Sequence, residues 1–327
     1  MRTILFLVLF AATCTQAQTP PSKPNQPAEP ATRKSILNDP NPEGEGVRDT
    51  VLKMGVESGR ENDHGRDSRV FTVPVACGDA KANFTWGCGG QTIISAWFAD
   101  EARIEIHANE DLKAVVDGEG KPLFLGDSSV EIFIGGKSHP TTAWIMRDGQ
   151  FNKEVPGVIG YDIAKKYQWE IDPHVPQITL RAPGALAKGT VLATLPLKDD
   201  QDNLWIHVKV KGVEDDVTIM PQTPDFQVAP SMQKAWDLDH GGIPPENIKT
   251  YLGNLRVITM QGKDGIHFNK DVFETNFPAY LLGENPNART AIGQSLLNRF
   301  VYSVDAVRKE MILIERVPGP STKPVAR

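Results

Sequence analysis

Two aspartates at matching points of an internal repeat are the first residues of this sequence whose type and spacing suggest chemistry. Asp172 and Asp305 lie 133 positions apart (305 − 172), and Gly160 and Gly293 have the same separation of 133 (293 − 160). Two carboxylates that share one proton can act as a general acid and a general base. An aspartate at the end of a strand is also a common turn former, and we favour this structural role for both residues.

Cys88 is a second candidate, because its thiol lies among glycines and can act as a nucleophile if a nearby base generates the thiolate. The sequence places none of the seven histidines beside it. Cys77 lies earlier in the same predicted hairpin. The two thiols are either paired in a disulfide, which requires Cα atoms within roughly 7 Å, or unpaired and buried. A buried or disulfide-bonded Cys88 is favoured over a catalytic one.

Asp237, Asp239 and His240 have side chains that can bind a metal ion. Their spacing matches neither a calcium-binding loop nor a His-Glu-x-x-His helix, and the three cysteines of the chain are too few for a four-cysteine zinc site. Asp225 has no carboxylate partner in the other copy of the repeat, where Thr92 stands at the equivalent position. We therefore predict loop positions for these residues, with no metal ion and no cofactor.

The composition limits the classes of protein to which these residues can belong. With 327 residues, 40% of them hydrophobic, the chain is long enough for about two domains with a sizeable core. The formal net charge is −6, and Lys and Arg form no clustered run. Phosphate binding needs such a cluster, so a nucleic-acid partner is disfavoured.

Residues 1–17 have the features of a signal peptide, namely Arg2, the apolar run 4–12 and small residues at the cleavage site. We predict cleavage after Ala17 and a secreted or periplasmic protein. Cys14 offers a lipoprotein alternative, but Thr13 directly before it fits a lipidation signal poorly. No later run is long and apolar enough to span a membrane.

Two segments outside the expected globular body have a weak structural signal. Residues 18–68 begin as a Pro-rich linker and end in a weak predicted helix, because Asp49–Val56 has only a few apolar residues at helical spacing. Residues 317–327 contain three further prolines and are predicted to be a disordered tail.

Alternation of apolar and polar residues predicts a β-hairpin over 70–86, with its turn at Gly78 and Asp79. Adding 133 maps its apolar positions onto those of 204–219 without a gap, so one register aligns the hairpins and the carboxy-terminal blocks of both copies. Between these blocks, short β-prone runs are separated by Gly and Asp, including the turn Gly135-Gly136. The sequence predicts a mostly β body made of two related halves.

This order of elements resembles the retropepsin-like and pepsin-like aspartic protease family. The most specific part is the block that contains Gly157–Asp162, then the strand ending in Asp172, then Ile178–Leu180. The resemblance covers about residues 68–316 in two copies. It implies two tandem β-barrel lobes with few short helices, at residues 69–195 and 196–316, that face each other across a peptide cleft.

The family carries an Asp-Thr-Gly or Asp-Ser-Gly loop at the end of the second hairpin strand of each lobe. The matching positions in this chain are Gly87-Cys88-Gly89-Gly90 and Met220-Pro221-Gln222-Thr223, and neither loop contains Asp. Gly87 has no side chain, and the Met220 thioether cannot transfer a proton at useful pH. Acid–base catalysis by a carboxylate pair is therefore not expected at these positions.

The resemblance implies that the peptide cleft is kept, because binding an extended segment mainly uses backbone pairing and side-chain pockets. It places Cys88, Gly89, Gly90, Gln222 and Thr223 at this cleft. Phe133 and Trp144, in a predicted hairpin nearby, either line the cleft or fill the core. We expect a non-catalytic protein that binds peptide or protein segments. The alternative is an active endopeptidase that uses Cys88 or carboxylates from elsewhere in the chain.

Overall fold

The computed structural model is built mostly of β-strands. It describes residues 49–57, 70–87, 89–116, 120–149, 151, 154–185, 189–199, 203–210, 213–221, 226–229, 232–233, 246–250, 253–257, 259–262, 266–268, 271–274, 277–281 and 290–315. The prediction of a mostly β body with few short helices is confirmed. No helix in these ranges is long and apolar enough to cross a membrane.

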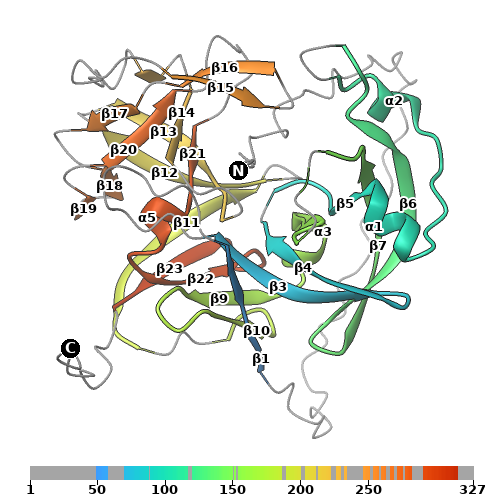
Figure 1. Cartoon of the computed structure of the whole chain (residues 1–327). Coiled ribbons are helices and arrows are strands. Elements are labelled where there is room, and N and C mark those ends of the chain that lie inside the picture. Colours follow the sequence, from blue (N-terminus) through green and yellow to red (C-terminus); the bar gives the residue numbers. More distant parts are fainter. Residues whose placement is uncertain are drawn as a thin grey trace, which may run out of the picture.

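The elements follow each other in two series that begin and end in the same order and differ in the middle (Figure 1). The first series is β1 (Thr50–Lys53), β2 (Gly55–Glu57), β3 (Val70–Cys77), β4 (Ala80–Trp86), β5 (Ile93–Ser95), α1 (Ala96–Glu101), α2 (Glu110–Lys113), β6 (Phe124–Ile134), β7 (Lys137–Met146), β8 (Gly157–Ile159), α3 (Tyr161–Ala164), β9 (Gln168–Asp172) and β10 (Gln177–Arg181).

The second series begins after β10 and ends at residue 314. It consists of β11 (Val191–Asp199), β12 (Leu204–Val210), β13 (Val213–Ile219), β14 (Phe226–Val228), β15 (Glu246–Thr250), β16 (Gly253–Val257), β17 (Thr259–Gly262), β18 (Ile266–Phe268), β19 (Asp271–Glu274), β20 (Phe277–Leu281), β21 (Ala291–Ile292), α5 (Gln294–Leu297), β22 (Val301–Asp305) and β23 (Glu310–Ile314).

The predicted hairpin over 70–86 is present as β3 and β4. Apolar side chains on alternate positions, such as Val73, Val75 and Phe84, are buried, as expected for strands with one face on a core. Gly78 forms the turn with a φ of +56°, a left-handed conformation that glycine adopts without a steric penalty.

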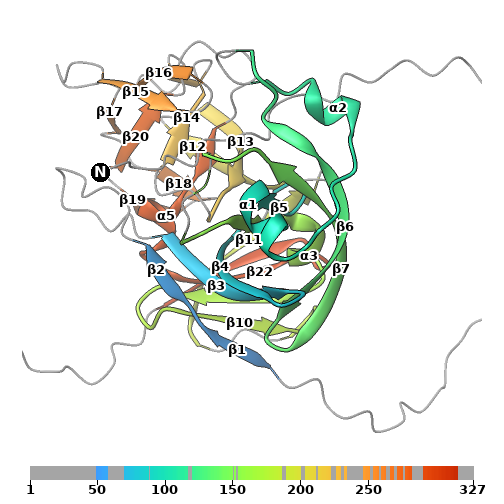
Figure 2. The same cartoon turned by 45° about the vertical axis from the view of Figure 1, so that its right-hand side comes forward.

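The strands of the first half close into a ring. Neighbouring strands follow the order β3, β4, β8, β5, β7 and β6, and β6 pairs again with β3. β8 is inserted between β4, to which it is parallel, and β5, to which it is antiparallel. Figure 2 shows β6 and β7 curving around this ring. After β7 the chain thus returns as β8 to the position between β4 of the first hairpin and the short strand β5.

The second half repeats this arrangement. β21 lies between β13, to which it is parallel, and β14, to which it is antiparallel. The bounds of β4, β5, β9 and β10 become those of β13, β14, β22 and β23 when 133 is added to each residue number (for example 213 − 80 = 133). The structure therefore carries the internal repeat at the level of strand pairing as well as sequence.

The amino-terminal part of the folded body differs from the prediction. The weak helix predicted over Asp49–Val56 is wrong, because β1 pairs with β10 and β2 pairs with β3. In the second half β11 makes both kinds of pairing, with β23 and with β12. Met54 is buried between the two short strands. The repeat therefore starts near residue 49 rather than at 69, and the last part of the predicted linker belongs to the fold.

The two halves are joined by a shared sheet in the order β1, β10, β9, β22, β23 and β11. At its centre β9 of the first half pairs antiparallel with β22 of the second, with Ile171 opposite Tyr302. Trp169 and Tyr302 point into a core that continues from one half to the other. In Figure 1 the strands β23, β22, β9, β10 and β1 lie next to one another in the lower part of the molecule.

Candidate functional site

The two loops that follow β4 and β13 are held by the same backbone hydrogen bond. The amide of Gly87 donates to the carbonyl of Ile159, and the amide of Met220 donates to that of Ile292, each at 2.9 Å. Both pairs are related by 133 positions (220 − 87 and 292 − 159). Gly87 and Met220 are buried. Gly87 and Met220 are thus equivalent positions in the structure, and neither has a carboxylate.

Gly160 sets how closely the chain approaches the first loop. A Cβ atom on Gly160 would lie 2.4 Å from the carbonyl carbon of Gln91, a distance that real side chains do not show. The Gly160 amide donates to the Thr92 hydroxyl at 3.1 Å. The next amide, that of Tyr161, donates to the Gly90 carbonyl at 2.8 Å. Glycine at this position lets the strand-to-helix corner support the loop.

Asp162 is a carboxylate of this frame that the repeat does not reveal, because Ser295 stands at its equivalent position (162 + 133). It accepts a hydrogen bond from the Thr92 hydroxyl at 2.9 Å and another from the Thr141 hydroxyl. Both carboxylate oxygens are therefore engaged in joining the loop, β7 and α3. This arrangement gives Asp162 a structural role beneath the loop.

The second loop is supported by a different side chain. Gln294 stands where the first half has Tyr161, and its Nε2 donates to the carbonyl of Pro221 at 2.8 Å, directly after Met220. Its side chain is buried, with 1% of its surface exposed. Sequence reasoning missed this residue, since a single glutamine inside a repeated block has no distinguishing signal.

Asp172 and Asp305 form turns and do not meet each other. Asp172 accepts from the amides of His174 and Val175, and Asp305 accepts in the same way from two amides of the turn after β22. Asp305 is paired with Gln168, four residues before Asp172 on β9, which separates the two aspartates by about 13 Å. A shared proton requires contact, so this pair cannot act as a displaced dyad.

The predicted cleft residues that the structure describes are not all brought together. Trp144 lies beside the first loop, because its amide donates to the Thr92 carbonyl at 2.9 Å, and its ring packs edge-on against Phe124 at 5.4 Å. Phe133 is paired with Ala76 near the turn of the first hairpin. This end of the hairpin lies about six strand residues, or roughly 20 Å, from Gly87. Phe133 therefore does not line a site with Gly87.

Cys77 is a free, buried thiol at the turn of the first hairpin. Burial, together with the negative charge of Glu131, raises the pKa of this thiol, so it has little thiolate character. Gly87, directly before Cys88, lies at the opposite end of β4 from Ala80, the partner of Cys77. Cys77 is therefore placed away from the first loop and forms no disulfide within the described residues.

Several predicted residues and segments lie outside the described residues. These are Cys14, Cys88, Gln222, Thr223, Asp225, Asp237, Asp239 and His240, together with residues 1–17 and 317–327. Among the residues that are described, no group of three or more His, Cys, Asp or Glu side chains is arranged to hold a metal ion.

The chain was compared with protein-family models and with curated protein sequences, and neither comparison gives a match.

Proposed function

We propose that this chain is a two-lobed protein of the aspartic-protease type of fold that binds an extended peptide or protein segment without cleaving it. The observation that carries the proposal is the matched pair of loops at Gly87 and Met220, each held by an amide-to-carbonyl hydrogen bond of 2.9 Å. Equivalent loops thus occur in both halves, and neither has a carboxylate at the position where the resembled family carries one.

The strand order supports the fold part of this proposal. In each half a hairpin is followed by a loop and a short strand, and a later strand is inserted between them before a short helix. The resembled family has its catalytic loop at this corner. The pairing of β9 with β22 joins the two halves of this chain.

The chemistry of the loops supports the non-catalytic part. Aspartic proteolysis requires one carboxylate to activate water and another to protonate the substrate carbonyl. Gly87, Gly89, Met220 and Pro221 offer no group that can accept or donate a proton with its side chain. Each well-placed acid or base contributes typically 10²- to 10⁴-fold to a rate, so the loss of both leaves no route through this pair.

The proposed class of ligand follows from the kinds of binding that need no carboxylates. An extended segment can pair through its backbone with exposed strand edges and place alternate side chains in pockets. We include export and the absence of a nucleic-acid partner in the proposal, because they follow from residues 1–17 and from the net charge of −6.

The discriminating experiment uses purified protein and fluorescently labelled unfolded casein over roughly pH 3 to 8, a range that covers carboxylate and imidazole titration. We expect saturable binding with no turnover, with and without a thiol-blocking reagent. Turnover that the reagent abolishes would replace the proposal with a thiol peptidase using Cys88. Turnover that the reagent does not change would indicate carboxylates from elsewhere in the chain.

A matched pair of variants locates the binding. Gln91 is half-buried in the first loop, and Gln177 is half-buried on the shared sheet. We expect Gln91→Arg to weaken casein binding at least tenfold and Gln177→Arg to leave it unchanged. Equal effects of the two variants would show that binding does not occur at the loops.

A further inference from the structure

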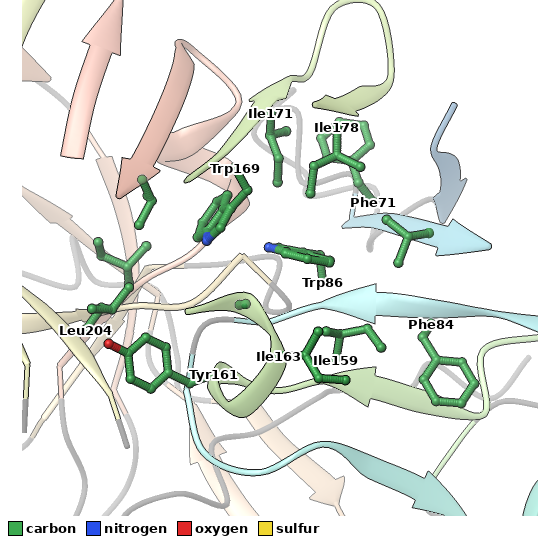
Figure 3. Packing of buried hydrophobic residues seen from close by; sticks show 14 of the residues in the cluster. Phe71, Phe84, Trp86, Ile159, Tyr161, Ile163, Trp169, Ile171, Ile178 and Leu204 are labelled. Carbon is green, nitrogen blue, oxygen red and sulfur yellow. The ribbon is translucent and has the colours of Figure 1, made fainter. Parts of the chain in front are cut away.

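A line of buried aromatic rings begins directly beside the first loop. Trp86 is the last residue of β4 and precedes Gly87, and 1% of its surface is exposed. Its ring meets that of Trp169 on β9 edge to face, with centroids 6.0 Å apart and an angle of 67° (Figure 3). Trp169 in turn meets Tyr302 of the second half at 6.0 Å and 80°. The ring contacts therefore cross from one half to the other.

The same line continues to the second loop through hydrogen bonds. Gln294 donates from Nε2 to the Tyr302 hydroxyl at 3.4 Å and to the Pro221 carbonyl at 2.8 Å. Pro221 follows Met220 directly. Trp169, Tyr302 and Gln294 each have 1% or less of their surface exposed, so water does not compete for these contacts.

We propose that Trp86, Trp169, Tyr302 and Gln294 couple the two loops, so that a displacement at Gly87 changes how firmly Met220 is held. This inference goes beyond the proposed function and does not depend on it, because it concerns the folded chain without a ligand. Buried side chains at native packing density transmit displacements to their neighbours rather than absorbing them. Each step in this line is a direct contact, so a continuous packed route joins the two loops.

Trp86 and Trp169 are explained by the packing of their rings rather than by hydrogen bonds. The indole nitrogens of Trp86 and Trp169 are buried and have no hydrogen-bond acceptor among the described residues. Leaving a buried donor unpaired is unfavourable, so hydrogen bonding does not explain tryptophan at these positions. The size of the indole does, because both rings reach across the junction into edge-to-face contact, as Figure 3 shows for the labelled Trp86 and Trp169.

The line of contacts has no second copy at the equivalent positions of the repeat. The residue equivalent to Trp86 in the second half is Ile219, and the residue equivalent to Gln294 in the first half is Tyr161. An isoleucine has no ring to meet Tyr302 edge to face, and Tyr161 supports its loop through its backbone amide. The line of contacts we propose therefore occurs once in the repeat, between Trp86 at the first loop and Gln294 at the second.

The test is hydrogen exchange of the Met220 amide in the full chain, measured relative to the Thr218 amide, which lies two residues earlier on β13. Both amides are hydrogen-bonded, to Ile292 and Thr290 respectively, so their ratio removes effects of global stability. We expect Trp86→Phe, a change in the other half, to raise the Met220 rate relative to Thr218 at least fivefold, the lower end of typical coupling between sites.

The second arm separates coupling from simple loosening. In a Gln294→Leu background the line is broken, and Trp86→Phe should no longer change the ratio. Phe84→Leu, a buried change two residues from Trp86 and outside the line, should leave the ratio unchanged although it lowers stability. An unchanged ratio in Trp86→Phe, a persistent effect in the Gln294→Leu background, or an equal effect of Phe84→Leu would each overturn the proposal.

Discussion

The stability of the first half should depend on the protonation of one buried histidine. His139 on β7 has 4% of its surface exposed, and its Nε2 lies 3.1 Å from the hydroxyl of Tyr167. Burial, followed by the positive charges of Lys166 and Lys137, lowers the pKa of His139 from 6.5 to about 4. The folded protein thus keeps this imidazole neutral at pH values where a free histidine is protonated.

The magnitude and sign follow from proton linkage. Between about pH 6.5 and pH 4 the unfolded chain binds a proton at His139 that the folded chain does not bind, so folding loses stability as the pH falls. The contribution is constant above about pH 6.5. One pKa unit corresponds to 1.36 kcal/mol, so the full loss is about 3 kcal/mol, of which about 2 kcal/mol is reached by about pH 5.

The assay compares the wild type with His139→Gln by urea unfolding at pH 7 and pH 5. Glutamine stays neutral, so the stability advantage of the wild type over the variant should shrink by about 2 kcal/mol on acidification. His107→Gln, which removes an exposed imidazole of the same half, is the control. A difference between wild type and His139→Gln that is the same at both pH values would refute the reasoning.

Three further predictions concern the residues that support the fold, and each is tested by urea unfolding. Gly160→Ala should lower the free energy of unfolding by about 3 kcal/mol, because its Cβ would meet backbone atoms that cannot move aside. A loss under about 1 kcal/mol would show that the backbone at this position can shift to accommodate the methyl group. Arg181→Met should lower the free energy of unfolding by about 3 kcal/mol, since Glu170 loses the guanidinium that donates to it at 2.8 and 3.2 Å. Adding Glu170→Met should recover most of this loss, and a double variant as unstable as Arg181→Met would contradict the reasoning. Asp305→Ala should lower the free energy of unfolding by about 1 kcal/mol more than Asp172→Ala, because Asp305 also accepts a hydrogen bond from the Gly184 amide, between the two halves. Equal losses in the two variants would show that this hydrogen bond is unimportant.

The repeated parts of the fold could be predicted because their pattern is local and occurs twice. Alternating apolar residues with a glycine turn predict the first hairpin, and the offset of 133 transfers it to the second half. The turn roles of Asp172 and Asp305 follow from the same logic, since each ends a strand before polar residues. Local chemistry was sufficient in these places.

Other parts depend on contacts between distant segments and could not be read from the chain. The strands β1 and β2 have few apolar residues, and they form because β10 and β3 offer edges to pair with. Thr92 and Asp162 look like ordinary polar residues until the fold brings their side chains within 2.9 Å. The position of Phe133, far from the loops, depends on the register of β6 against β3, which the sequence does not specify.

The neutral residues at Gly87 and Met220 have a consequence for stability as well as for chemistry. Two carboxylates placed together in a buried junction repel each other, and at least one must take up a proton at neutral pH. Active sites commonly retain such strain at a cost in stability. With glycine and methionine at these positions, each loop keeps its hydrogen bond, to Ile159 or to Ile292, without any such repulsion. This is what the proposed function requires of the two loops, which would hold a segment rather than cleave it.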